Sequence, residues 1–176
     1  MRVERVQLGL ALCLIAIGVG LRLLPHPANF APIAAIALFG GAVLPRRLAV
    51  VVPVVAMMVS DLFIGFYSMM PVTWGCYALI ALASSHWLRR PNVVKGTALT
   101  LGSSLFFFVV TNFAVWLTSG MYAHSGVGLA RCYEMALPFF RNTALSDVLY
   151  TAGLFSLFGL ANIAIRRRLV APPTPS

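Results

Sequence analysis

The feature that most constrains this chain is a series of long apolar segments separated by short connections. An apolar segment of about 15 to 23 residues can cross a hydrocarbon core of ~30 Å, the shorter ones where a loop dips inward. Six segments meet this condition, near residues 7–24, 30–44, 48–67, 72–88, 96–118 and 144–165. We therefore expect an all-α integral membrane protein with six transmembrane helices in a single domain, residues 1–170, and a disordered tail at 171–176.

Composition agrees with a membrane protein and excludes most soluble classes. Of the 176 residues, 60% are hydrophobic and only 10% are charged, whereas soluble domains carry about 25% charged residues. The net charge of +9 could indicate a nucleic-acid partner. The cations, however, lie in short clusters at the ends of apolar segments rather than along one polar face, so no nucleic acid is expected.

Those clusters predict the orientation of the chain. Ten of the thirteen Lys and Arg residues precede the first segment or follow the second, fourth and sixth, namely Arg2, Arg5, Arg46, Arg47, Arg89, Arg90, Lys95, Arg166, Arg167 and Arg168. Positive charge near span ends marks the cytoplasmic face, so both termini are expected inside a bacterial inner membrane. A signal peptide is the alternative at the N-terminus, but no small-x-small cleavage site follows the first segment.

Two outer connections differ from the inner ones. Residues 24–32 contain three prolines, which forbid a continuous helix and leave His26 and Asn29 at the outer surface. Residues 119–143 are expected to form a long outer loop that is rich in aromatic side chains. Loops of that length in a compact domain usually carry function as a lid or binding loop.

Acidic residues near the membrane are functional candidates, because burying a carboxylate there costs several kcal/mol. Asp61 is the strongest case, and its alternative role is structural pairing with a hydroxyl or amide of a neighbouring span. Asp147 is expected in the first turn of the sixth span, where it complements the helix dipole and Asn142 or Thr143 can cap.

Aromatic and small residues suggest two further surfaces. Asn112 and Trp116 share one face of the fifth span, at the level of Tyr67, Trp74, Tyr77 and Tyr122. This group is either a ligand site or an interfacial aromatic belt. In the first span, Ala16 and Gly20 form a small-xxx-small pair, and Gly9 and Cys13 form another; such pairs let another helix approach closely, within the chain or from a partner.

Cys76 stands beside Gly75, Trp74 and Tyr77 at the start of the fourth apolar segment. It is a small apolar residue, one half of a disulfide with Cys132, or a soft metal ligand. The chain contains no Walker A loop, H-E-x-x-H or G-x-S-x-G motif. A single soft ligand in an aromatic, outward-facing pocket suits a substrate that carries its own metal in a planar macrocycle.

Three motifs carry a resemblance to a known family: residues 25–33 (PHPANFAPI), residues 60–67 (SDLFIGFY), and Cys76 early in the fourth span. With the six-span pattern, they resemble the substrate-binding S components of energy-coupling-factor (ECF) transporters, which capture vitamins from the outer side. More narrowly, the chain is similar to the BtuM-type vitamin B12 S components. The resemblance covers nearly the whole chain at the level of span pattern.

The resemblance implies cobalamin uptake, with Cys76 as an axial ligand of the cobalt and loss of an upper cyanide favoured by that ligation. Sulfur donates strongly to cobalt, and the metal in turn favours the thiolate. Position alone suggests the residues that contact the corrin: His26, Asn29, Asp61, Tyr67, Trp74, Tyr77, Asn112, Trp116, Tyr122 and Asp147.

The resemblance also implies partners, an ECF coupling subunit that docks on Ala16 and Gly20 and the ATPases behind it. No ATP-binding motif is found in the chain. We expect primarily a transporter, and whether it also decyanates cyanocobalamin through Cys76 stays open. Three alternatives stay open: uptake of another vitamin or metabolite, a structural membrane protein that docks a periplasmic partner, and a membrane enzyme acting on lipid.

Overall fold

The computed structural model describes residues 2–89 and 92–170. Within these residues the chain is entirely helical apart from its connections, which confirms the all-α prediction. Six helices follow one another: α1 (Arg2–Leu23), α2 (Ile33–Val43), α3 (Arg46–Ile64), α4 (Met70–Trp87), α5 (Val93–Thr118) and α6 (Gly126–Val170). Four of them, α1, α3, α5 and α6, are long and apolar enough to cross a membrane. The expected disordered tail, 171–176, lies outside the described residues.

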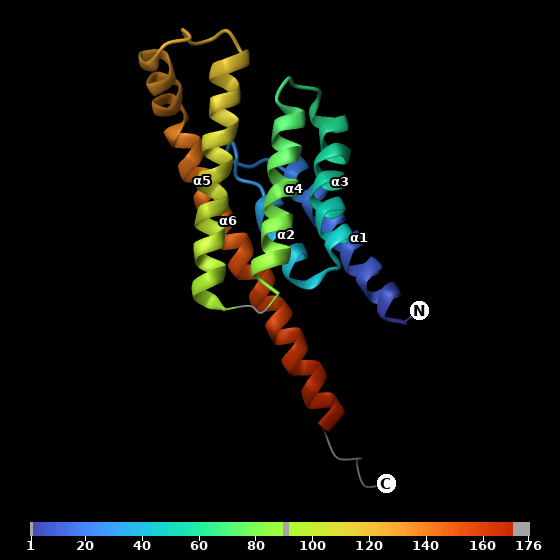
Figure 1. Cartoon of the computed structure of the whole chain (residues 1–176). Coiled ribbons are helices and arrows are strands. Elements are labelled where there is room, and N and C mark those ends of the chain that lie inside the picture. The colour runs from blue at the N-terminus through green and yellow to red at the C-terminus, as the bar shows by residue number, and fades with distance from the viewer. Residues whose placement is uncertain (1, 90–91, 171–176) are drawn as a thin grey trace, which may run out of the picture.

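Successive helices run in opposite directions, so the bundle has two distinct ends (Figure 1). The start of α1 and the end of α6 point to the same end, which we call the lower end. The connections at 24–32, 65–69 and 119–125 lie toward the opposite, upper end. Most of the basic clusters belong to helix termini at the lower end, as the sequence pattern predicts.

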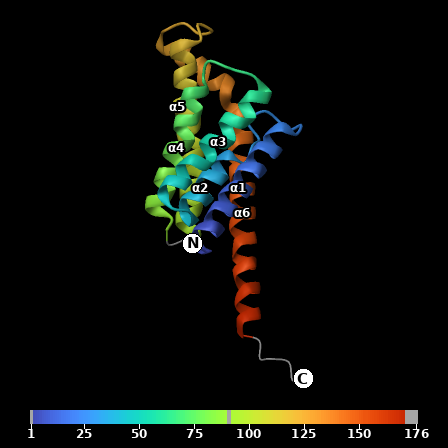
Figure 2. The same cartoon turned by 90° about the vertical axis from the view of Figure 1, so that its right-hand side faces the viewer.

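Helix α2 is a short buried element rather than a full span. Its 11 residues extend for about 16 Å, well below the ~30 Å of a hydrocarbon core. Every residue from Ile33 to Gly41 is buried, and α2 packs against all five other helices, in the middle of the bundle (Figure 2). The predicted span at 30–44 is therefore too long, because Pro32 and Pro45 bound the helix and the preceding loop descends into the bundle.

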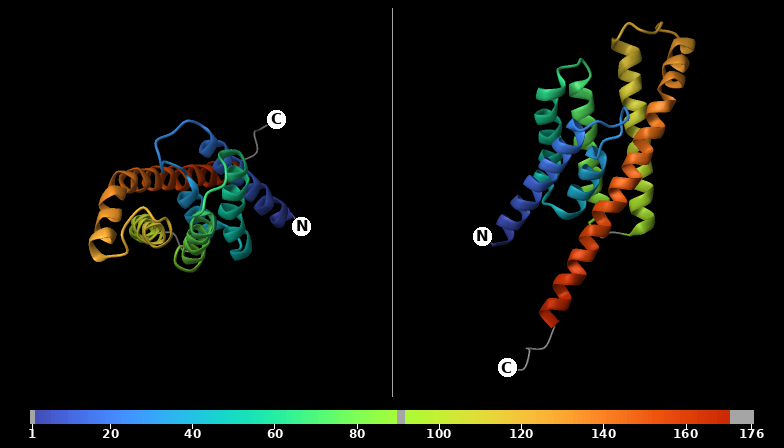
Figure 3. Two further views of the ribbon diagram at one scale, coloured as in Figure 1. Left: turned by 90° about the horizontal axis from the view of Figure 1, so that it is seen from above. Right: turned by 180° about the vertical axis from the view of Figure 1, so that it is seen from behind.

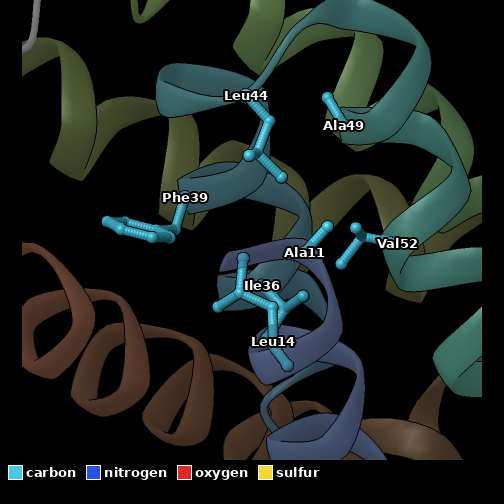
Figure 4. Packing of buried hydrophobic residues seen from close by; sticks show 7 residues of the cluster. All are labelled: Ala11, Leu14, Ile36, Phe39, Leu44, Ala49 and Val52. Carbon is cyan, nitrogen blue, oxygen red and sulfur yellow. The ribbon is translucent and has the colours of Figure 1, made fainter. Parts of the chain in front are cut away.

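The core joins α1, α2 and α3 around Ile36, whose buried neighbours include Leu14 and Val52 (Figure 4). Packing between α2 and α4 depends on Gly41. A Cβ atom on Gly41 would lie 2.5 Å from Ser84 Cβ, and the Ser84 hydroxyl donates a hydrogen bond to the Leu38 carbonyl at 2.5 Å. The two backbones approach this closely because one of them carries no side chain.

The upper connection between α5 and α6 is shorter than the sequence pattern suggests. Residues 126–143, expected to form most of a long outer loop, are helical, and α6 extends over 45 residues. The segment is rich in Ala, Leu, Met and Arg, which favour helix, and its aromatic residues pack on α5. Pro138 lies inside α6, and the helix bends rather than stops (Figure 3).

Candidate functional site

The first buried polar group joins α1, α3 and α4. Arg22 Nη1 donates hydrogen bonds to Asp61 Oδ1 and to Ser60 Oγ, both at 2.5 Å. Trp74 Nε1 donates to the other carboxylate oxygen of Asp61 at 2.8 Å. The Asp61 side chain is 1% exposed and that of Arg22 is 13% exposed. We call Arg22, Ser60, Asp61 and Trp74 the Arg22 cluster.

Both oxygens of Asp61 are thus occupied by protein groups. Asp61 is paired structurally, as one of the two sequence interpretations proposes, but with a guanidinium and an indole instead of a hydroxyl or amide alone. Sequence reasoning did not identify Arg22 as a site residue. Its position along the chain could have indicated this role, because Arg22 is one of three cations that do not fall in the basic clusters of the inner side.

The second buried polar group lies between α5 and α6. Asp147 is 2% exposed, and Ser104, which is fully buried, donates to Asp147 Oδ2 at 2.6 Å. Arg22 forms an ion pair with Asp61, whereas no cationic side chain of the described residues lies against Asp147.

The expected position of Asp147 is wrong. The residue lies in the interior of α6 instead of its first turn, because the helix begins at Gly126. Asn142 and Thr143 do not cap it: Asn142 donates to the Ala28 carbonyl at 2.9 Å, and Thr143 donates to the Phe139 carbonyl at 3.0 Å. Asp147 faces Ser104, which is close to the midpoint of α5.

Cys76 and Tyr77 lie on α4, just after Trp74 of the Arg22 cluster. Cys76 is 2% exposed. The Tyr77 ring stacks on Phe107 of α5, with the ring centroids 5.0 Å apart. Tyr77 also packs against two buried clusters, one that includes Leu38 and Ile80 and one that includes Ile33 and Met57.

Other predicted contact residues lie near the upper end of α1 and α4. The His26 ring is within hydrogen-bonding distance of the carbonyls of Arg22 and Pro27, at 3.2 and 2.8 Å. Asn29 is exposed and adopts a positive φ of 60°, a conformation that Asn tolerates better than most residues. Tyr67 shares a hydrogen bond of 3.0 Å with Thr73.

A separate set lies at the upper end of α5. The Asn112 side chain donates to the Phe108 carbonyl of its own helix at 2.8 Å. Trp116 donates to the Ala123 carbonyl at 3.0 Å, next to the half-buried Tyr122. The structure therefore separates the predicted contact residues: one group lies around Asp61, another lies at the top of the α5–α6 hairpin, and Asp147 lies deeper, beside Ser104.

Three cavities lie away from these residues. The largest of the three, about 740 Å³, separates α4 from α5 and is lined by Trp87, Lys95 and Phe106, among others. A second of about 380 Å³ lies between α5 and α6, and a third of about 520 Å³ lies near Arg46 and Arg89. None of the three is lined by Cys76 or by a predicted contact residue.

All three cysteines are free thiols, so the disulfide alternative for Cys76 and Cys132 is not realised. Cys132 donates instead to the Asn112 carbonyl at 3.4 Å. Among the described residues, no set of three or more His, Cys, Asp or Glu side chains gathers to hold a bare metal ion. A cobalt ion bound through Cys76 would need its remaining ligands from a macrocycle.

The small residues of α1 divide between two faces. Gly18 packs inward, where an added Cβ would lie 3.0 Å from Ile36 Cδ1. Ala16 and Gly20 are exposed, and so are Gly9 and Cys13. These small-xxx-small pairs therefore do not serve packing within the chain.

These helices and their buried polar groups are those of a helical membrane protein. Residues 3–170 match the model of DUF6580, a family of unknown function, and the chain belongs to that family. No curated protein and no solved structure matches the chain.

Proposed function

We propose that this protein binds a small solute at the upper end of its bundle for uptake across a bacterial inner membrane, and that the solute is cobalamin. In this proposal the chain acts as an S component and Cys76 is the axial ligand of the substrate's cobalt. The observation that carries it is the position of Cys76, which is buried on α4 beside Tyr77 and two residues after Trp74, a member of the Arg22 cluster.

The charge distribution supports an outward-facing upper end. The helix termini at the lower end are flanked by basic residues: Arg5, Arg46, Arg47, Arg89, Lys95, Arg166 and Arg167. The positive-inside rule then makes that end cytoplasmic. With six alternating helices, both termini are cytoplasmic, and the loops at 24–32, 65–69 and 119–125 face the outside.

The proposed chemistry is a ligand substitution at cobalt. The Cys76 thiol loses its proton, the sulfur donates an electron pair to cobalt, and the upper cyanide leaves with its own pair to take up that proton. The oxidation state of the metal does not change. Metal coordination stabilises the thiolate, so deprotonation and cobalt binding reinforce each other.

Binding requires a conformational change, because Cys76 is buried in the present arrangement. We place it at the α4–α5 boundary, whose lower half already holds a cavity of about 740 Å³ lined by Trp87 and Lys95, among others. Movement of the α5–α6 hairpin away from α4 would uncover Tyr77 and Cys76. The exposed Ala16 and Gly20 on α1 leave a face free for an ECF coupling subunit.

A visible-spectrum titration tests this proposal. Purified protein is mixed with cyanocobalamin, freed of excess ligand, and compared with Cys76→Ala; Cys132→Ala is the matched control, because it removes another buried free thiol. We expect retained corrinoid with shifted bands in the wild type and in Cys132→Ala, and no shift in Cys76→Ala. Absence of corrinoid from the wild type would reject cobalamin as the substrate.

A further inference from the structure

Asp147 is placed where an ionised carboxylate is most costly. Its partner Ser104 is near the middle of α5, a helix of 26 residues that extends for about 39 Å. If α5 crosses the membrane, Asp147 lies close to the bilayer midplane, where a charged side chain costs several kcal/mol unless it is compensated. Asp61, by contrast, has Arg22 beside it.

The hydrogen-bonding groups around Asp147 can serve its protonated form as well as its ionised form. Ser104 has a single hydroxyl hydrogen, and Ser104 Oγ lies 2.6 Å from Asp147 Oδ2 and 3.1 Å from the Thr100 carbonyl. If Asp147 is ionised, Ser104 must donate to it and cannot donate to Thr100. If Asp147 is protonated, its hydroxyl donates to Ser104 and Ser104 donates to Thr100, so each hydrogen has an acceptor.

A cavity in the lower half of the bundle is lined by Thr100 and Thr151, one helical turn from Ser104 and Asp147. It has a volume of about 380 Å³ and lies between α5 and α6. Polar side chains follow its length, from Asn92 at the start of α5 to Thr100 and Thr151 near Asp147. Thr151 Oγ1 is buried and has no hydrogen-bond partner within the described residues. Because a buried hydroxyl without a partner is costly, it is suited to hold a water molecule in this cavity.

We propose that Asp147 is a proton-binding site that exchanges its proton with the lower end through the α5–α6 cavity. The step is reversible protonation: the carboxylate takes up one proton and becomes a neutral acid. The proposal concerns proton binding by the membrane-embedded bundle, and it does not depend on cobalamin as substrate.

Few other ionisable groups face this site. Helices α2 and α5 pack against α6; α2 carries no ionisable side chain, and α5 carries only Lys95, nine residues before Ser104. Tyr77 of α4 interacts electrostatically with Asp147, and Tyr150 follows it on α6, where its ring contacts Phe30. Neither tyrosine supplies a positive charge.

Infrared spectroscopy of the full-length protein in lipid tests proton binding. The chain has only four Asp and Glu side chains, so ¹³C labelling of aspartate separates Asp61 and Asp147 from the two glutamates. We expect the carbonyl band of a protonated aspartic acid at neutral pH in the wild type and its loss in Asp147→Asn. Ser104→Ala keeps the acid but removes its hydrogen-bonding partner, and it should shift the band even if Asp147→Asn fails to fold.

The route is tested by the rate at which this band shifts after transfer to D₂O. Gly96→Leu fills the α5–α6 cavity, and Gly102→Leu, the matched control on the same helix, fills the α4–α5 cavity. Neither glycine has another atom within 4 Å of an added Cβ. We expect exchange several-fold slower in Gly96→Leu and unchanged in Gly102→Leu. A wild type without the protonated aspartate band overturns the proton site, and equal rates in the two variants overturn the route.

Discussion

Replacing Arg22 by Met would leave the Asp61 carboxylate buried with the Trp74 indole and the Ser60 hydroxyl as its neighbouring hydrogen-bonding groups. Removing one partner of a buried ion pair costs about 3 to 5 kcal/mol. The lower value applies here, because the Arg22 side chain retains 13% exposure. We therefore expect Arg22→Met to lower the free energy of unfolding by about 3 kcal/mol. Asp61→Asn should cost about 2 kcal/mol, the usual loss when a hydrogen-bonding group loses its partner, since Arg22 can turn partly toward solvent.

The double variant tests whether the pair acts as a unit. Independent sites would add to about 5 kcal/mol, whereas contacting residues couple by about 0.5 to 3 kcal/mol. We expect the double variant to cost about 3 kcal/mol, a coupling of about 2 kcal/mol.

Reversible unfolding in mixed micelles, followed by far-UV circular dichroism, measures these differences. The exposed Arg141→Met is the control for loss of an arginine and should change stability by less than about 0.5 kcal/mol. Additive costs, or single variants as stable as the control, would show that the Arg22–Asp61 pair does not hold α1 against α3.

Three further predictions concern packing, capping and thiol access. Gly41→Ala should lower stability by about 1 to 3 kcal/mol, because its Cβ would overlap Ser84, whereas Gly102→Ala should not; equal thermal stability of the two would argue against the close α2–α4 approach. Asn92→Ala removes the side chain that accepts from the amides of Val94 and Lys95 and should cost about 1 kcal/mol in the same denaturation assay; no loss would exclude the cap. In detergent, N-ethylmaleimide should modify the buried Cys76 several-fold more slowly than the same residue of the unfolded chain, and equal rates by mass spectrometry would show that the upper end is open without ligand.

The helical class and the approximate position of each helix could be predicted from the sequence, since apolar length and terminal charge are local properties. The central position of α2 could not be predicted from the sequence. Ile33–Val43 is as apolar as a transmembrane span, and only its burial on every side, seen in the structure, shows that it is a central helix. The start of α6 was predicted too late, because an aromatic stretch with Pro138 has the composition of a loop but packs as a bent helix.

The sequence predicted several residues of the candidate site, but it did not predict which of their side chains contact one another. Trp74 donates a hydrogen bond to Asp61. Tyr77, one turn further along α4, lies within electrostatic range of Arg22, the ion-pair partner of Asp61. The role of Arg22 depends on the crossing of α1 over α3, which spacing along the chain does not encode. Asp147 was explained as a helix-end charge only because the helix boundary was misplaced, and the corrected boundary makes it the uncompensated acid of the bundle.

Cobalt-edge X-ray absorption of the purified protein loaded with cyanocobalamin tests the central claim most directly. The account predicts a sulfur atom in the first coordination shell of cobalt in the wild type and in Cys132→Ala, and only nitrogen, oxygen or carbon ligands in Cys76→Ala. Bound corrinoid whose cobalt has no sulfur neighbour in the wild type would contradict the assignment of Cys76 as its ligand.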